Sequence, residues 1–401
     1  MLTRFFLLIL TLLFVSGGDA TNNNKPPRPK STAAQPATQA TGKTADSAPH
    51  KVRMMFAGDI MSQLVQIESA QIGDNEFSYD HCFRYMRPIF EQADLVVGNL
   101  ECTLMGEPPY TGYPNFKSPE QLAEALKKNG FDVLVTSNNH SLDGGLNGVN
   151  NTIKSVRNEG FMHTGTFKNE QYRQLLYPLI IYKNGIKIAL LNYTHHTNGL
   201  KSQFPSVVNR LDMDVVKKDI QKAKQMKADF IITFLHWGEE HQLDEDSNQR
   251  AVAKIMHNWG SDLVVGSHPH VVQPIKNEVV TIAGKPHNYL TAYSLGNFIS
   301  SQPFVHTEGG IVFEVNITKD QNRTSIENYY YIPVLRYTPR EKGKTRYYAL
   351  PVSPFENSDN NLNMPIGERE KMTNFARRIR AQLGAFGAKE RKFTLDKVVL
   401  E

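Results

Sequence analysis

The sequence is poor in cysteine and tryptophan, with two of each among its 401 residues. Cys82 and Cys102 stand alone and far apart, which excludes a zinc–thiolate centre of the kind built from paired cysteines. Their spacing cannot decide their redox state. A disulfide, which an oxidising compartment permits, and two buried free thiols both remain open.

Concentrated basic charge is also lacking. Lys and Arg together number 45 and Asp and Glu 40, a net charge of +5. Residues 21–50 hold four basic residues against one acidic residue, so +3 of this excess lies there. The rest of the chain is nearly neutral and has no Lys/Arg stripe, which excludes a nucleic-acid partner. With 40% apolar and 21% charged residues, the chain is neither wholly disordered nor a polytopic membrane protein.

Long apolar runs are lacking as well, apart from one at the start. Residues 1–20 have the order of a secretory signal peptide: a basic start at Met1–Arg4, the apolar run Phe5–Val15, then small residues. That run is shorter than the ~20 residues of a membrane-spanning helix. Residues 21–50 are rich in Pro, Asn and Thr and predict a disordered linker. We expect an exported protein, periplasmic or extracellular, either free or tethered by an uncleaved N-terminal segment.

From Lys51 onward, short apolar runs rich in β-branched residues alternate with helical patterns, which predicts an α/β domain over residues 51–318. The predicted strands are Val52–Ala57, Leu95–Val97, Val133–Thr136, Ile188–Leu191, Phe230–Leu235, Leu263–Val265 and Tyr289–Tyr293. The predicted helices are Leu122–Lys128, Asp212–Met226 and Asn248–Trp259.

The first of these helices has the clearest end signals. Ser118 is the expected N-cap, Pro119 the first helical residue, Gln121 the partner in a capping box and Gly130 the C-terminal stop. Residues 319–401 predict a mixed C-terminal extension to the same domain. It contains a strand over Tyr329–Tyr337 and a helix over Glu368–Leu383.

Ligand-type side chains follow five of the predicted strands. In open α/β sheets, ligands bind outside the carboxyl ends of the strands. The residues found there are Asp59, Glu101, Asn138-Asn139-His140 with Asp143, His236 with Glu240, and His268-Pro269-His270. Each alone has an ordinary explanation as a cap, a turn or a packed aromatic pair, but five successive strand ends together indicate one site. Mixed oxygen and nitrogen ligands suit zinc, manganese or iron.

These stretches resemble the bacterial capsule synthesis protein CapA family (poly-γ-glutamate capsule proteins), whose domain is similar to the calcineurin-like metallophosphoesterases. Six motifs carry the resemblance between about residues 53 and 300, in the family's order. They are Gly58-Asp59-Ile60-Met61, Gly98-Asn99-Leu100-Glu101, Asn138-Asn139-His140-Ser141-Leu142-Asp143, His236-Trp237-Gly238-Glu239-Glu240, Gly266-Ser267-His268-Pro269-His270 and Tyr293-Ser294-Leu295-Gly296-Asn297-Phe298.

The resemblance implies a four-layer α/β/β/α sandwich, metallophosphoesterase-like, with two sheets flanked by helices. It implies that His140 acts on the leaving group or the bound substrate, while Asp143 either orients His140 or caps the next helix. The metal ligands that it implies are Asp59, Glu101, Asn139, His236, His268 and His270.

Two positions depart from the related patterns. The wider superfamily has Asp-x-His as its first motif, whereas this chain has Met61 in the place of the histidine, and a thioether is a poor ligand for a hard ion. We therefore expect either one or two divalent ions per chain. His241 stands where the CapA family commonly has tyrosine. The residues expected on the substrate side are His195, His196, Glu240 and His241, although exposed loop histidines are an equal alternative for the first two.

The resemblance implies a metal-dependent hydrolase or transferase in the synthesis of capsule, poly-γ-glutamate or another surface polymer. Its expected partner is the anionic polymer or a precursor, alone or within an envelope synthesis complex. Two ions would suit in-line phosphoester hydrolysis, and one would suit amide or γ-carboxyl chemistry on polyglutamate. Two alternatives stay open: a phosphoesterase of nucleotides or cell-wall intermediates, and a polymer-binding subunit without catalysis.

Overall fold

The computed structural model describes residues 49–282, 285–321, 323–356 and 362–394, all within one compact unit. The predicted signal peptide (1–20) and nearly all of the predicted linker (21–50) lie outside the described residues. Among the helices that are described, none combines the length and the apolar character needed to cross a membrane.

The first sheet has nine strands, and β1 (His50–Ile60) runs through its middle. On one side of β1 the strands are parallel: β4 (Leu95–Leu100), β7 (Val133–Val135) and β8 (Met162–Thr164). On the other side successive strands are antiparallel: β18 (Gly309–Asp320), β19 (Arg323–Tyr337) and β22 (Tyr348–Pro351). Two short strands join this sheet, β17 (Asn297–Ile299) beside β1 and β23 (Lys389–Glu390) beside β19.

The second sheet has six strands in the order β10-β11-β13-β14-β16-β15. Its four central strands are parallel: β11 (Ile186–Thr194), β13 (Phe230–His236), β14 (Leu263–Ser267) and β16 (Lys285–Ala292). The edge strands β10 (Leu179–Lys183) and β15 (Ile275–Ile282) are antiparallel to their neighbours. The seven strands predicted from the sequence are confirmed as members of these two sheets, with small shifts at their ends.

Alternation along the strands creates the layers. In β1, Met54 and Phe56 belong to the apolar core between the sheets, together with Ile232 of β13. The intervening Met55 belongs to the cluster on the other face of the first sheet, and Ile231 to the cluster on the other face of the second. A strand that is buried on both faces reads as a continuous apolar run, which is why the sequence pattern showed these strands.

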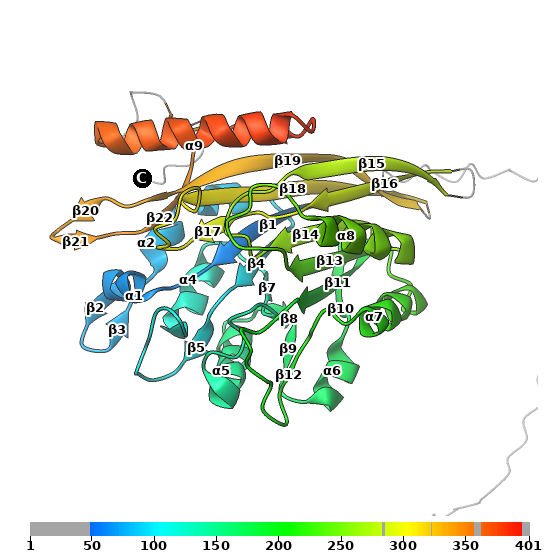
Figure 1. The fold of residues 1–401 in the computed structure, drawn as a ribbon, viewed down its shortest axis with the longest axis horizontal. Helices are drawn as coiled ribbons and strands as arrows, with labels where there is room; N and C mark the ends of the chain where they lie inside the picture. Colours follow the sequence, from blue (N-terminus) through cyan, green and yellow to red (C-terminus); the bar gives the residue numbers. More distant parts are fainter. Residues whose placement is uncertain (1–48, 283–284, 322, 357–361, 395–401) are drawn as a thin grey trace, which may run out of the picture. The chain divides into compact units, whose positions relative to one another are not determined.

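Helices cover both outer faces and complete the predicted four-layer α/β/β/α sandwich (Figure 1). The first sheet is covered by α2 (Asp80–Phe83), α3 (Arg87–Phe90) and α4 (Gln121–Lys128), and the second by α7 (Met213–Gln225) and α8 (Ser247–Trp259). The remaining elements are α1 (Leu64–Ala70), β2 (Gln71–Gly73), β3 (Glu76–Phe77), β5 (Thr103–Met105), β6 (Lys117–Pro119), α5 (Gly145–Asn158), β9 (Thr166–Phe167), α6 (Glu170–Leu176), β12 (Val207–Val208), β20 (Arg340–Glu341), β21 (Lys344–Thr345) and α9 (Ile366–Gly384).

The predicted start of α4 is wrong. Ser118 and Pro119 belong to β6, which pairs with β5, and the helix begins only at Gln121. The Ser118 hydroxyl donates to the carbonyl of Ser62 at 3.2 Å instead of capping the helix. The predicted stop is confirmed, because Gly130 follows the last helical turn with a left-handed φ of +96°.

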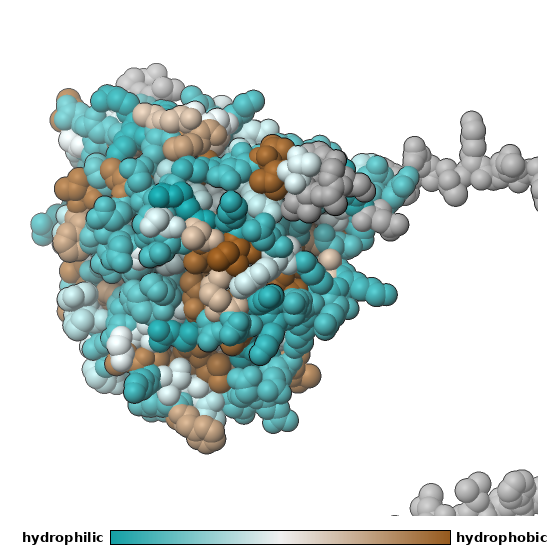
Figure 2. Space-filling view, turned by 45° about the vertical axis from the view of Figure 1, so that its right-hand side comes forward, coloured by the Kyte–Doolittle hydropathy of each residue, from teal (hydrophilic) through white to brown (hydrophobic). Residues whose placement is uncertain are grey.

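The C-terminal part of the chain is built into the same sandwich. Strand β18 runs through residue 318 and pairs along its length with β19. Helix α9 lies along the top of the molecule in Figure 1, above β19. Its buried side chains, including Phe375 and Ile379, belong to the core between the sheets. The face drawn in Figure 2 is mostly hydrophilic, with apolar side chains gathered near its centre.

Candidate functional site

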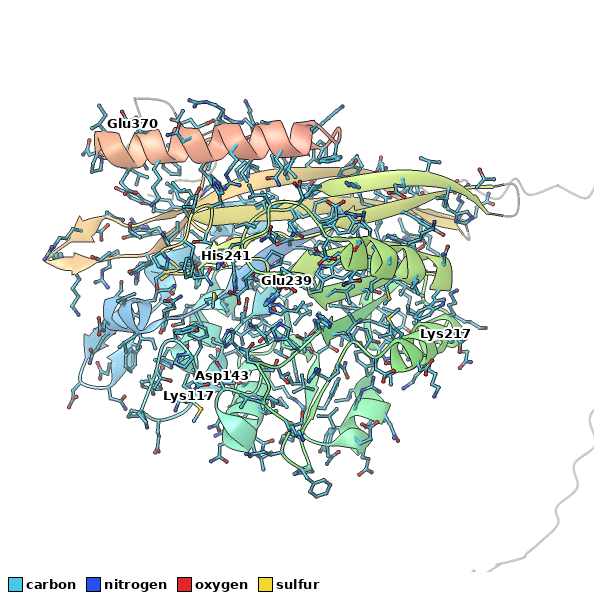
Figure 3. All side chains as sticks on the ribbon, viewed as in Figure 1. Lys117, Asp143, Lys217, Glu239, His241 and Glu370 are labelled. Atoms are coloured by element: carbon cyan, nitrogen blue, oxygen red, sulfur yellow. The ribbon has the colours of Figure 1, made fainter. Side chains whose placement is uncertain are left out.

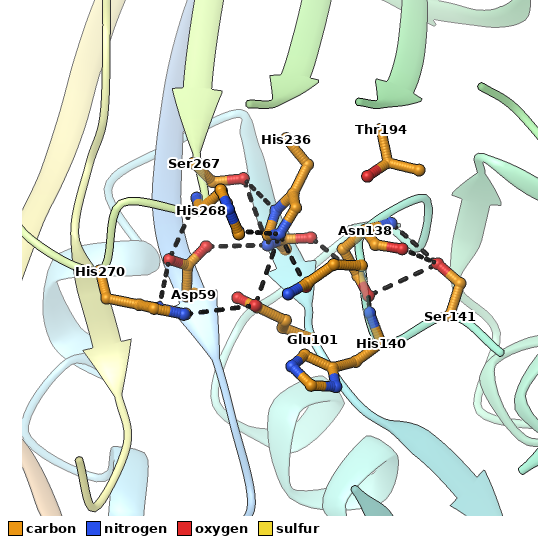
Figure 4. Close-up of polar contacts among 12 residues, drawn as sticks. Asp59, Glu101, Asn138, His140, Ser141, Thr194, His236, Ser267, His268 and His270 are labelled. Carbon is orange, nitrogen blue, oxygen red and sulfur yellow. Dashed lines mark hydrogen bonds and ion pairs between the residues drawn. The ribbon is translucent and has the colours of Figure 1, made fainter. Parts of the chain in front are cut away.

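Side chains from both sheets converge where the parallel strands end (Figure 4). The first sheet contributes Asp59, near the end of β1, and residues that follow β4 and β7; the second contributes His236, the last residue of β13, and residues that follow β14. All six residues that the resemblance implied as ligands are at most 3% exposed: Asp59, Glu101, Asn139, His236, His268 and His270. Water therefore has little access to their polar atoms, and these atoms must satisfy one another or a bound group.

Close packing of two backbone segments requires a glycine at position 58, just before Asp59. The carbonyl oxygen of Gly296 would lie 1.9 Å from a Cβ atom at position 58, so only glycine fits there. The same carbonyl accepts a hydrogen bond from the Asp59 backbone N–H at 3.0 Å, which holds the end of β1. In the loop after β14, His268 and His270 have positive φ values of +101° and +59°, which are uncommon for residues other than glycine.

Glu101 lies at the centre of the cluster. Both of its carboxylate oxygens are buried, and neither accepts a hydrogen bond. Its Oε1 lies 3.4 Å from Nε2 of His236 and 3.6 Å from Nε2 of His270. Burial raises the pKa of this carboxyl well above its usual value, and the neighbouring Asp59 adds to the effect. A buried carboxyl without a donor is costly unless a cation is placed against it.

Burial and local contacts shift the pKa values of His236, His268 and Asp59 in the direction that favours metal ligation. Burial lowers the pKa of His236 and of His268 well below the usual value, so both rings are neutral. Burial alone would raise the pKa of Asp59, but contacts with His270 and Asn99 outweigh it and the pKa is lowered. The Asn99 side-chain amide donates to Asp59 at 2.8 Å.

The ligand-type atoms form overlapping groups that fit divalent ions. Glu101 belongs to one group with His236 and His268, and to a second with Asp59 and His270. A third group joins Glu240 to His268 and His270. Within each group the nearest ligand atoms lie within 4.8 Å of one another. Met61 is buried in the apolar cluster on the helix-covered face of the first sheet, so it packs the core at the position of the superfamily's missing histidine.

Asp143 orients His140. Its Oδ2 lies 2.7 Å from Nδ1 of His140 and also accepts the backbone N–H of Phe116 at 2.6 Å. The alternative, a cap on α5, is not seen: the N-cap residue is Gly144, and no side chain makes a cap hydrogen bond there. Asn139 contacts the cluster directly, with its Oδ1 2.9 Å from Nε2 of His236.

Three further polar residues hold the site together. The sequence analysis placed Asn138 at one of the strand ends but assigned no role to Ser267 or Asn99. Ser267 places its Oγ 2.9 Å from Nδ1 of His236, and Asn99 contacts both Asp59 and Ser267. Asn138 donates to the carbonyl of Leu100 at 2.7 Å and so ties the β7 loop to β4. All three lie inside the motifs quoted above, which is the only sequence signal that marks Ser267 and Asn99.

Of the four residues expected on the substrate side, Figure 3 labels His241, which lies near Glu239. The half-buried ring of His196 lies 5.0 Å from that of His268. His195 is exposed and lines a cavity of about 240 Å³ with Trp237 and Glu239. Glu240 is exposed, and the His241 ring packs 4.5 Å from that of Phe304. His196 therefore faces the cluster, and His195 lies on its outer rim.

Cys82 and Cys102 are buried free thiols, which decides between the two states left open by the sequence. Burial raises the pKa of both thiols, that of Cys102 to about 12. Neither thiol is therefore a thiolate ligand or nucleophile at neutral pH.

Comparison with known proteins agrees with the motifs. The family model described as bacterial capsule synthesis protein PGA_cap matches residues 53–302. The chain is 30% identical over 280 residues to the capsule biosynthesis protein CapA of Bacillus anthracis, covering 67% of this chain and 64% of that protein. It is 29% identical to the PGA biosynthesis protein CapA of Bacillus subtilis (strain 168), covering 66% of this chain and 67% of that protein. The chain thus spans about two thirds of the length of these relatives.

Solved structures show weaker likeness. The NAD nucleotidase NadN of Haemophilus influenzae aligns with a TM-score of 0.45 and 12% identity, over 82% of this chain and 56% of that one. The calcineurin-like phosphoesterase YfkN of Bacillus subtilis aligns with a TM-score of 0.43 and 13% identity, over 85% of this chain and 100% of that one.

Proposed function

The chain belongs to the bacterial capsule synthesis protein family PGA_cap, and from this premise we propose that it is an exported metal-dependent hydrolase or transferase acting on an anionic surface polymer or its precursor. One observation carries the proposal. Glu101 is fully buried, neither of its oxygens accepts a hydrogen bond, and the neutral rings of His236 and His268 share its ligand group. This donor set fits a divalent cation better than it fits an apolar core.

Two overlapping ligand groups would hold the metal. One consists of Glu101, His236 and His268, and the other of Asp59, Glu101 and His270. When bound, a divalent ion supplies Lewis acidity, which polarises a carbonyl or phosphoryl oxygen and acidifies water. The burial of the cluster limits the water that competes for these positions.

His140 is the residue of this chain that would move a proton. Asp143 already accepts the Phe116 N–H on the oxygen that faces His140, so that oxygen is an acceptor and Nδ1 of His140 carries the hydrogen. Nε2 is then the atom left to exchange a proton with a substrate. The ring is 5% exposed, so it is open to the rim of the site but largely shielded from bulk water.

A second candidate function, a phosphoesterase of nucleotides or cell-wall intermediates, is favoured by the sharing of Glu101 between two ligand groups. If two ions were bound, Glu101 could be a ligand in both groups, and a pair of ions would favour in-line displacement at phosphorus by stabilising charge on the attacking and leaving oxygens. Amide chemistry on polyglutamate needs only one ion.

Elemental mass spectrometry on the full chain, purified without a metal-binding tag, tests the proposal. The parent should contain roughly one or two divalent ions per chain, as in one- and two-metal hydrolases. Glu101→Gln should lose most of this metal, whereas Glu370→Gln, on the exposed face of α9 and far from the site in Figure 3, should retain it. Assays on poly-γ-glutamate and on phosphoesters then separate the two functions.

Two results would contradict the proposal. A parent chain without metal after soaking in manganese and zinc would favour a polymer-binding subunit without catalysis. Equal metal content in the parent and in Glu101→Gln would place the ion elsewhere.

A further inference from the structure

Asn297, at the start of β17, touches the site without belonging to any of the ligand groups. Residue 297 pairs with Asp59 in the parallel register of β17 and β1, and its side chain is 1% exposed. Its amide nitrogen donates to the backbone carbonyl of Thr307 at 3.1 Å and to Oε1 of Gln302 at 2.8 Å. Because a backbone carbonyl can only accept, these contacts fix which end of the amide is nitrogen. The amide oxygen of Asn297 therefore faces the site.

That oxygen, together with Asp59, fixes the tautomer of His270. It lies 3.1 Å from Nδ1 of His270, and Oδ2 of Asp59 lies 3.1 Å from the same nitrogen. Two oxygen acceptors on one ring nitrogen require that nitrogen to carry the hydrogen. In the neutral ring Nε2 is then left with a free lone pair. This atom lies 3.6 Å from Oε1 of Glu101, which accepts no hydrogen bond.

We propose that Asn297 is a positioning residue that holds the His270 ring with its hydrogen on Nδ1 and its Nε2 lone pair turned toward Glu101. The inference rests on the proposed metal-dependent function, because a cation between Nε2 and Glu101 is what makes this orientation useful. It also gives Asn297 a role beyond holding the end of a strand.

The backbone alone does not fix the His270 ring. Residue 270 has a φ of +59° in a loop, so no regular strand geometry sets the direction of its side chain. Asn297, in contrast, is anchored by a well-bonded segment. The Thr307 hydroxyl donates to the carbonyl of Phe304 at 2.7 Å, and Arg336 donates to the carbonyl of Gln302 at 2.8 Å. These bonds keep the amide oxygen in place as a fixed reference point for the ring.

Three variants separate positioning from support of the fold. Asn297→Ala removes one of the two oxygens that accept from Nδ1 of His270 and leaves only Asp59 in that role. It should weaken the binding of Mn²⁺ or Zn²⁺ about 10–100-fold, as for other residues that orient a metal-binding histidine. Thr307→Val removes the hydroxyl bonds of the same segment but keeps the backbone carbonyl that Asn297 uses, so it should bind the ions as the parent does. Asn297→Asp keeps an oxygen for His270, so its affinity should recover toward that of the parent even if its melting temperature does not.

Metal affinity is measured by titrating each metal-stripped full chain with Mn²⁺ or Zn²⁺ against a chelating dye, with melting temperature recorded in parallel. Parent affinity in Asn297→Ala would overturn the proposal. So would equal losses in Asn297→Ala and Thr307→Val, because they would indicate a structural role only.

A second readout does not depend on the metal. Imidazole ¹⁵N shifts of the metal-stripped chain, with His270→Gln to assign the signal, should show the hydrogen on Nδ1 in the parent. In Asn297→Ala, where Asp59 is the one acceptor left on Nδ1, the share of the Nε2 tautomer should rise. A hydrogen on Nε2 in the parent would overturn the positioning role. If the parent binds no ion but this tautomer change is still seen, the metal-dependent function fails and the positioning of His270 stands.

Discussion

Asp143 accepts two hydrogen bonds on one oxygen, from His140 and from the backbone of Phe116. Asp143→Asn keeps the size of the side chain but replaces the carboxylate that faces Nδ1 of His140 with an amide. We expect kcat to fall roughly 10–100-fold on the best substrate of the proposed panel, because the proton-exchanging ring is less well oriented. KM and metal content should stay near those of the parent, since Asp143 belongs to none of the ligand groups.

His140→Ala is the companion variant. It should cost at least as much in kcat as Asp143→Asn, and the double variant should cost little more than His140→Ala alone, because Asp143 acts through His140. Fully additive losses in the double variant would show that Asp143 acts on something other than His140.

At the residue scale, the sequence identified the residues that touch the cluster but not those that orient them. Asp59, His236 and His268 stand at or just after the ends of apolar strands, so their position in the chain predicts their position in space. Ser267 and Asn99 act through contacts between the sheets, such as the one from Asn99 to Ser267 across 168 residues. No local pattern encodes a distance of that kind.

Helix α8 contains a buried histidine, His257, from which we predict how the stability of the fold depends on pH. The Nδ1 atom of His257 lies 2.8 Å from the carbonyl of Ser261, and its Nε2 lies 2.9 Å from the Thr291 hydroxyl, as suits a neutral ring. Burial lowers the pKa of His257 from 6.5 to about 4. The unfolded chain takes up a proton at pH 6.5 and the folded one only near 4, so this contribution to stability is complete above 6.5 and is lost as the pH falls toward 4.

The loss amounts to at most about 3 kcal/mol of unfolding free energy for this residue. Denaturant titrations at pH 7 and pH 4.5 should show a smaller drop in His257→Gln than in the parent. His287→Gln, at an exposed position of β16, should follow the parent. An unchanged drop in His257→Gln would mean that the acid sensitivity comes from other groups.

At the scale of elements, the long buried strands and the capped helices were predictable and the short strands were not. Asp212 caps α7 by accepting the N–H groups of Asp214 and Val215, and Asp246 with Gln249 forms a capping box on α8. These are local interactions. Ser118 carried an equally good local signal for α4, but pairing of β6 with β5 placed it in a strand. Tertiary pairing outweighs a capping preference worth about 1 kcal/mol.

At the scale of the whole molecule, strand order was the feature that the apolar pattern did not contain. The pattern alone suggested one open sheet, and the division into two came from the resemblance. The reason lies in pairings such as β1 with β18, which join residues 50–57 to residues 312–319. Contacts between the sheets are equally distant in sequence: His268, after β14, donates its backbone N–H to Asp59 of β1 across 209 residues. The site therefore exists only when the whole sandwich is assembled.

A substitution in helix α9 tests whether the sandwich folds and unfolds as one unit. Phe375 is 2% exposed and belongs to the core between the sheets, so we expect Phe375→Ala to lower the unfolding free energy by about 3–5 kcal/mol. The chain's two tryptophans, Trp237 and Trp259, belong to the cluster between the second sheet and its helices, so their fluorescence reports on a distant layer.

If the sandwich unfolds as one unit, the thermal transition seen by tryptophan fluorescence should move down in Phe375→Ala. It should stay in place in Glu370→Ala, whose side chain is exposed on the same helix and whose effect should be within about 0.5 kcal/mol. The opposite result would be an unmoved tryptophan transition in Phe375→Ala, with a loss of helix at a lower temperature. That result would show that α9 is only an appendage. Binding of metal at the distant strand ends would then not depend on it.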